Sequence, residues 1–149
     1  MRRRLWAVLA AGLILLFFLI VYPSFQCRVT RDEIAVSPIK PFVIPAPQGY
    51  AVGFSFNLTN MSGCELRAES IHVTLRDFVY PSGNSTALGL SENGQLDTTM
   101  MPKESAPFSY AFNSYFDSRP AELLLKIEIT FTGAGTITIF DGEVSIPTP

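Results

Sequence analysis

Few residues of this 149-residue chain have side chains that could do chemistry on their own. There is one histidine, His72, and there are two cysteines, Cys27 and Cys64. Zinc sites take about four ligands, and no spacing of carboxylates completes such a set here. The sequence also lacks a Gly-x-Ser-x-Gly motif, a phosphate-binding loop and a nucleotide fingerprint. We therefore expect no catalytic residue, no metal, no cofactor and no enzymatic activity, and we interpret His72 as a surface residue without a partner.

The two cysteines are candidates for a disulfide bond. Cys27 follows an apolar N-terminal segment, and Cys64 lies in a predicted turn after a predicted strand. Outside the cytosol an even number of cysteines favours a disulfide. Closing this loop would restrict the unfolded chain by about 4 kcal/mol in the chain-entropy model. The alternative is two unrelated thiols.

Three asparagines begin Asn-x-Ser/Thr triplets and are candidate glycan acceptors: Asn57, Asn60 and Asn84. Asn84 is the best candidate because "YPSGNST" is a predicted exposed turn, and a bulky glycan needs solvent. Asn57 lies on the polar face of a predicted strand and Asn60 at its end, so crowding should limit modification to one of them. The alternative is that all three are ordinary turn or strand asparagines.

An unbroken apolar run covers residues 5–22. As a helix, these 18 residues span about 27 Å, which is close to the thickness of a bilayer core. The run therefore predicts a transmembrane helix in contact with membrane lipid. A cleaved secretory signal is the alternative, but its apolar core is usually shorter, about 7–15 residues, and is followed by a small-x-small cleavage site.

Charge predicts the orientation of this helix. Three arginines lie within residues 1–4 and should keep that tail cytoplasmic. Residues 23–33 would then form a stalk, and residues 34–149 an extracytoplasmic domain of a single-pass membrane protein. The chain after the helix has 13 acidic and 8 basic residues, a net charge of −5, which excludes nucleic acid as a partner on electrostatic grounds.

The extracytoplasmic portion alternates apolar and polar residues with the period of a β-strand. The turn-rich separators between these runs include "NMSGC", "SENGQ" and "TGAGT". About seven short strands with turns at this spacing predict an all-β, immunoglobulin-like antiparallel sandwich. The Asp141-Gly142 pair signals a turn or bulge between the last two runs. The runs that suggest these strands cover residues 34–39, 50–59, 71–79, 86–90, 108–112, 123–131, 136–140 and 143–147, and those at 34–39 and 86–90 are the weaker two.

Prolines at positions 38, 41 and 45 place the first of these segments at a sheet edge, because proline cannot donate to a strand ladder. An incompletely paired edge offers free N–H and C=O groups to another chain. Candidate residues of such a partner edge are Ile34, Val36 and Ile39. The alternative is that the prolines only keep a stalk extended and protect the edge from pairing.

The order of these pieces resembles the group 2 late-embryogenesis-abundant domain, also called the water-stress and hypersensitive-response domain. The matching stretches are "FSFNLTN", "SIHVTLRDFV", "TTMMPKESAPFSYAF" and "ITFTGAGTITIFDGEVSI", and together they cover roughly Ile34 to Ile146. The resemblance implies an immunoglobulin-like sandwich behind a single N-terminal membrane helix. It also implies no shared catalytic residues, and roles in stress protection, lipid handling or membrane-proximal interaction.

These observations predict a membrane-anchored, non-catalytic interaction or structural module on the extracytoplasmic face, with a protein partner at a sheet edge. One alternative is a subunit of a surface filament or of a larger membrane assembly. Another is a lipid-handling domain, which would need an apolar cavity between the sheets.

Overall fold

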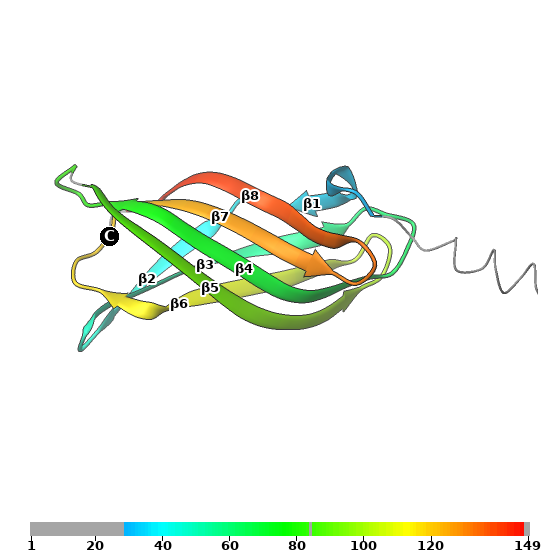
Figure 1. Cartoon of the computed structure of the whole chain (residues 1–149), viewed down its shortest axis with the longest axis horizontal. Coiled ribbons are helices and arrows are strands. Elements are labelled where there is room, and N and C mark those ends of the chain that lie inside the picture. Colours follow the sequence, from blue (N-terminus) through cyan, green and yellow to red (C-terminus); the bar gives the residue numbers. More distant parts are fainter. Residues whose placement is uncertain (1–28, 84, 148–149) are drawn as a thin grey trace, which may run out of the picture.

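The computed structural model describes residues 29–83 and 85–147 of the chain (Figure 1). A short 3-10 helix, η2 (Arg31–Glu33), precedes the strands. Among the described residues, no helix has the length and apolar character needed to cross a bilayer. The predicted cytoplasmic tail (1–4), the predicted transmembrane helix (5–22) and residues 23–28 of the predicted stalk lie outside the described residues. Val29, also assigned to the stalk, is buried in the core.

The strands form two antiparallel sheets that pack as a β-sandwich (Figure 1). In sheet A, β3 pairs with β1 and β2 along one side and with β6 along the other. Sheet B has the order β5-β4-β7-β8. The strands are β1 (Ile34–Val36), β2 (Lys40–Ala46), β3 (Gly49–Asn60), β4 (Leu66–Val79), β5 (Ser85–Met100), β6 (Ser105–Phe116), β7 (Glu122–Phe131) and β8 (Gly135–Ser145).

The core lies between the sheets and is built from the predicted period-2 positions. Alternate residues of each strand point to the same face, so one apolar face per strand is buried. The prediction is confirmed for β3, β4 and β7, whose inward residues are at most 3% exposed. These residues are Val52, Phe54, Phe56 and Leu58; Ile71, Val73 and Leu75; and Leu123, Leu125, Ile127, Ile129 and Phe131.

The described residues form eight strands, against about seven expected from the sequence. The segment read as a single strand over 34–39 ends at Val36, and β2 begins at Lys40. Pro38 lies in this interruption and has no N–H to donate to a ladder. Ser37 keeps the chain attached there: its N–H donates to the Asn57 carbonyl at 2.9 Å, and its Oγ accepts from the Asn57 N–H at 2.8 Å.

Two predicted turns are parts of strands. Asp141 and Gly142 were expected to be a turn or bulge, but they pair in register with Lys126 and Leu125 within a continuous β8. The register shift in this pair of strands comes just before them, between Ile127 and Glu128. The "SENGQ" stretch, also expected to be a turn, lies inside β5, where Gly94 pairs with Ile71. A long neighbouring strand provides partners at both places, and those ladder bonds outweigh the local turn preference.

Different connections between strands lie at the two ends of the sandwich. One end holds η2, the β3–β4 connection and the β5–β6 connection (Figure 1). The other end holds the β2–β3 turn, the turn after β4 and the β6–β7 connection. We call the second the far end, because the described chain begins beside η2.

Candidate functional site

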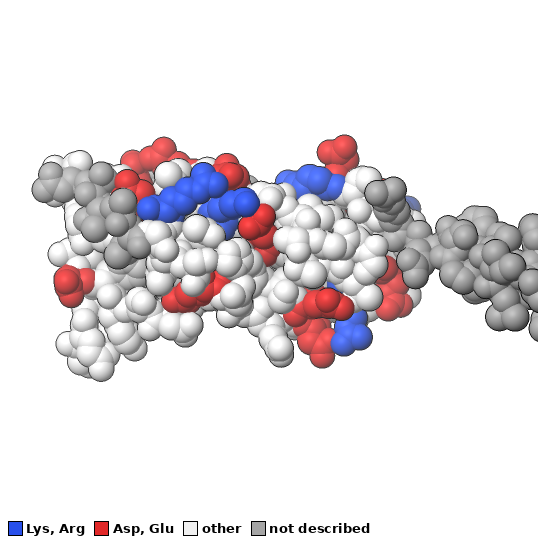
Figure 2. Space-filling model, in the orientation of Figure 1, with Lys and Arg blue, Asp and Glu red and all other residues white. Residues whose placement is uncertain are grey.

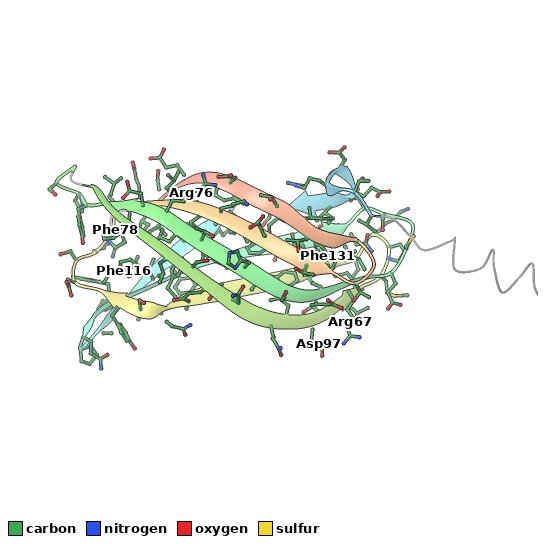
Figure 3. All side chains as sticks on the ribbon, in the orientation of Figure 1. Arg67, Arg76, Phe78, Asp97, Phe116 and Phe131 are labelled. Atoms are coloured by element: carbon green, nitrogen blue, oxygen red, sulfur yellow. The ribbon has the colours of Figure 1, made fainter. Side chains whose placement is uncertain are left out.

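The outer face of sheet B is rich in charge (Figure 2). Neighbouring side chains of opposite sign pair on it across and along the strands. Such exposed pairs add roughly 0–1 kcal/mol each to stability, so the face reads as a solvated surface. The pairs among the described residues are Arg67–Asp97 at 2.6 Å, Arg76–Asp141 at 2.9 Å and Lys126–Glu128 at 2.7 Å (Figure 3).

The outer face of sheet A is almost uncharged. Three rows of paired residues cross β2, β3 and β6: Lys40–Ser55–Ser109, Phe42–Gly53–Ala111 and Ile44–Ala51–Tyr115. Lys40 is the one charged residue in these rows. Toward the far end the face becomes apolar, and Ile44 and Tyr115 expose 56% and 51% of their surface. We call these three rows the sheet A face.

A groove of about 660 Å³ opens beside the sheet A face, where the edge strand is interrupted between β1 and β2. Asn57, whose side chain is exposed, lies in it next to its cross-strand partner Pro107. The lining is mainly hydroxyl, amide and proline groups rather than charges. Its residues are Ser37, Pro38, Lys40, Ser55, Phe56, Asn57, Pro107, Phe108 and Ser109.

A second pocket, of about 260 Å³, lies between the two sheets at the far end. Phe78, Tyr80 and Leu90 line it from the sheet B side, and the C-terminal part of β6 with Asp117 lines it from the sheet A side. We call it the aromatic pocket. The described residues that line it are Phe78, Tyr80, Leu90, Ser114, Tyr115, Phe116 and Asp117.

Glu92 holds the two sheets together next to the aromatic pocket. Its carboxylate on β5 accepts a hydrogen bond from the Tyr110 hydroxyl on β6 at 2.8 Å. It also accepts from the Asn113 backbone N–H at 3.1 Å and from Asn113 Nδ2 at 3.1 Å. Burial and then this hydrogen bond raise the pKa of Tyr110 above its ordinary value. The alternation of Leu90, Glu92, Gly94 and Leu96 could have revealed this inward carboxylate, but the stretch reads as a turn.

Asn60, a predicted glycan acceptor, is fully buried at the end of β3. Its Nδ2 donates to the carbonyl oxygens of Cys64 at 2.6 Å and Met100 at 3.0 Å. Its Oδ1 accepts from the backbone N–H and the hydroxyl of Ser62. A glycan attached to Nδ2 would need solvent that this site does not offer. The triplet therefore has a structural use, which is to close the turn between β3 and β4.

The other predicted site residues lie at separate places. Asn57 is exposed, and Asn84 lies outside the described residues. Cys27 also lies outside them, so the Cys27–Cys64 disulfide stays a prediction.

The three partner-edge candidates face their own domain. Ile34 is 2% exposed within the core, and the half-buried Val36 and Ile39 pack against it. The segment that carries them is bonded to β3 of the same chain.

His72 was expected to have no partner, and that expectation is wrong. Its Nδ1 lies 2.7 Å from Asn93 Oδ1, and its Nε2 lies 3.1 Å from Ser91 Oγ. Both partners belong to β5, because this strand continues through the stretch read as a turn. In the described part of the chain, histidine, cysteine and acidic residues form no group of three that could hold a metal ion.

Comparison with known proteins identifies the fold and no family. No family model and no curated protein matches the sequence. The X-ray structure of the Northeast Structural Genomics target SoR45 aligns over 81% of this chain and 91% of that chain, with a TM-score of 0.53 and 12% identity. The two proteins share a β-sandwich fold.

Two further solved structures align less well. The ApaA protein from Bordetella pertussis matches over 78% of this chain and 96% of that chain, with a TM-score of 0.48 and 12% identity. The alkylpurine DNA glycosylase AlkC of Pseudomonas fluorescens matches over 78% and 31%, with a TM-score of 0.44 and 11% identity.

Proposed function

We propose that this chain is a non-catalytic interaction module whose partner protein covers the sheet A face. In this proposal residues 5–22 anchor it in a membrane as a single-pass helix, and residues 34–149 lie on the extracytoplasmic side. The sandwich is then of the immunoglobulin-like kind that the resemblance to the group 2 late-embryogenesis-abundant domain implies. The crossing of the chain between sheets at β3–β4, β5–β6 and β6–β7 supports this assignment.

The observation that carries the proposal is the difference between the two outer faces. A protein surface without a partner is usually covered by mixed charges, as sheet B is. The cores of protein interfaces are instead depleted in charge and enriched in aromatic residues. The sheet A face shares the depletion in charge and contains the aromatic residues Phe42 and Tyr115, with the exposed Ile44 beside Tyr115 in one row.

The predicted partner edge and the sheet A face meet on β2. Pro41 and Pro45 remove N–H donors from this strand, so its free side offers an incomplete ladder to another chain. Ile44 belongs both to β2 and to the apolar end of the face. A partner that covers the face would therefore reach β2 without displacing β1 from the core.

Substitution of Ile44 by glutamate tests the proposal. The full-length protein is extracted from its native membranes, and the size of its complex is measured. We expect Ile44→Glu to reduce the complex about tenfold or more, because a charge buried in an interface without a partner costs several kcal/mol. The isolated protein should change in stability by less than about 0.5 kcal/mol, since Ile44 is largely exposed.

Leu124→Glu is the matched control, because Leu124 is an exposed apolar residue on the charged outer face of sheet B. We expect this variant to keep the complex. A complex that survives Ile44→Glu, or that is lost equally with Leu124→Glu, would contradict the assignment of the sheet A face as the partner surface.

A further inference from the structure

The aromatic pocket contains ring pairs at steep angles. The Phe78 ring lies 4.7 Å from the Tyr80 ring at an interplanar angle of 84°. It lies 5.3 Å from the Phe116 ring at 86° (Figure 3). In an edge-to-face pair, the ring that receives the edge turns its electron-rich face toward its neighbour. Tyr80 and Phe116 thus both meet Phe78 at steep angles, and Tyr115, which also belongs to the sheet A face, adds a fourth aromatic residue to the lining.

The charged residue in the described lining of this pocket is acidic. It is Asp117, and the described lining contains no lysine or arginine. Arg119 follows two residues later; it keeps its positive charge, and its guanidinium donates to the Pro147 carbonyl at 2.7 Å. Glu92 follows the lining residue Leu90 by two positions and is bonded to Asn113, which precedes the lining residue Ser114. The acidic group in the lining therefore favours a cation over an anion.

The walls of the pocket are fixed before any ligand arrives. Phe78 and Phe116 are 3% and 4% exposed, so the core holds their rings, and the more exposed Tyr80 and Tyr115 supply most of the accessible aromatic surface of the lining. The bonds from Asn113 to Glu92 attach the end of β6 to β5 just before the three β6 residues that line the pocket. A preformed site avoids part of the entropy cost of ordering side chains on binding.

We propose that the aromatic pocket binds a quaternary ammonium group, with the aromatic rings as its walls and the Asp117 carboxylate at its mouth. Aromatic side chains attract cations through the negative faces of their rings, most strongly when the cation is desolvated. A quaternary ammonium is weakly hydrated and apolar on its surface, so it can enter such a pocket at a low desolvation cost.

The volume also favours a small group. Pockets for drug-sized ligands measure about 300–1,000 Å³, and this one measures about 260 Å³. A trimethylammonium head fits within that space, whereas a whole lipid molecule would have to leave most of its surface outside. The pocket therefore does not by itself support lipid carriage.

The test compares choline with 3,3-dimethylbutan-1-ol, its neutral carbon analogue. The full-length protein is kept in a maltoside detergent, which has no ammonium group, and binding is followed by titration calorimetry and by nuclear magnetic resonance shifts. We expect saturable binding of choline and at least fivefold weaker binding of the neutral analogue, since only the cation gains the ring attraction. Equal binding of the two compounds, or no saturable binding of choline, would overturn the proposal.

Two substitutions locate the site. Tyr80→Leu keeps an apolar side chain against Phe78 but removes the ring face, and we expect about fivefold weaker choline binding. Tyr80→Phe keeps the face and should bind as the parent does. Asp117→Asn removes the rim charge and should weaken binding about threefold, whereas Asp32→Asn at the η2 end should not. Unchanged affinity in both Tyr80→Leu and Asp117→Asn, with the thermal transition preserved, would place the choline elsewhere and refute the assignment.

The same head group occurs on small solutes and on lipids, and a second arm separates these sources. Vesicles of phosphatidylcholine are added as competitors, with phosphatidylglycerol vesicles as the control. Competition by the first and not by the second would assign a lipid head group to the pocket. Choline binding without competition by either vesicle would assign a soluble ammonium compound.

Discussion

Glu92 on β5 accepts a hydrogen bond of 2.8 Å from the Tyr110 hydroxyl on β6, and this bond joins the two sheets across an open side of the sandwich. Asn113 donates to the same carboxylate from its backbone and its side chain. An inward-pointing charge on an edge strand also discourages that edge from pairing with another chain. Glu92 thus closes the β5–β6 side, and β2 remains the edge beside the sheet A face.

The Tyr110–Glu92 bond predicts a loss of stability at high pH. Burial and the bond to Glu92 raise the pKa of Tyr110 above its ordinary 10.0. A group whose pKa is raised on folding stabilises the fold below the unfolded value, and this contribution is lost as the pH rises above it. We expect the free energy of unfolding of the parent to fall as the pH rises above about 10, and to fall less in Tyr110→Phe.

Denaturant unfolding at a series of pH values measures this effect. Near neutral pH, Tyr110→Phe should be about 1.5–3 kcal/mol less stable than the parent, because it loses one hydrogen bond to a charged group. Tyr115→Phe is the control, since Tyr115 is a largely exposed tyrosine on the same strand. Identical alkaline profiles for the parent and Tyr110→Phe would show that the bond does not contribute in solution.

Asn60→Ala should be strongly destabilising. The side chain closes the β3–β4 turn through two donated and two accepted hydrogen bonds, and the residue is fully buried. We expect a loss of about 2–4 kcal/mol, because the carbonyl oxygens of Cys64 and Met100 lose a donor and the bond to Met100 is buried. Thermal and denaturant unfolding measure it, and Asn57→Ala, at an exposed position, should change stability by less than about 0.5 kcal/mol.

A side chain added at Gly53 should cause a steric clash on the sheet A face. A Cβ added there would collide with the Phe42 ring, which lies over Gly53, and with the backbone carbonyl oxygen of Tyr110 on β6. The ring could move, but the carbonyl is held by the strand ladder. Gly53→Ala should therefore cost about 1–3 kcal/mol. Gly63→Ala is the control, because a Cβ at Gly63 meets no atom within 4 Å. Equal melting temperatures of the two variants would contradict the close approach of β3 and β6.

Glycan occupancy should differ between the three acceptor triplets if the protein is produced in a glycosylating host. Asn60 should stay unmodified in the folded protein, because its Nδ2 is buried and engaged in two hydrogen bonds. The exposed Asn57 remains accessible, and Asn84 stays the best candidate predicted from the sequence. Intact-mass analysis of the single Asn→Gln variants assigns each glycan. A mass loss on Asn60→Gln alone would show that modification precedes folding of the β3–β4 turn.

The sequence predicted the architecture well because apolar and polar residues alternate along the strands, and this alternation indicates which face of each strand is buried. Val52 to Leu58 and Leu123 to Phe131 show the apolar face directly, and the structure buries it. Local turn signals were less reliable. Asn93-Gly94 and Asp141-Gly142 favour turns in isolation, yet β4 and β7 supply partners that keep both pairs in strands.

The candidate sites could not be predicted in the same way, because they depend on contacts between distant strands. Phe78 and Phe116 belong to different sheets, and only the packing of the sheets brings their rings to 5.3 Å. The rows of the sheet A face depend on the register of β2 and β6 against β3, which includes a shift between Ala51 and Gly53. The sequence marks Asn60 as a candidate glycan acceptor, and only the structure shows that its side chain is buried.

Site-specific photocrosslinking in the cells that make the protein shows whether a partner protein covers the sheet A face. A photoreactive residue is placed at Ile44, at Tyr115 or, as the control, at Leu124 on sheet B, and adducts are resolved by mass after irradiation. We expect the same protein adduct from Ile44 and Tyr115, which share one row of the face, and none from Leu124. Adducts from Leu124 alone, or no adducts from either position on sheet A, would contradict it.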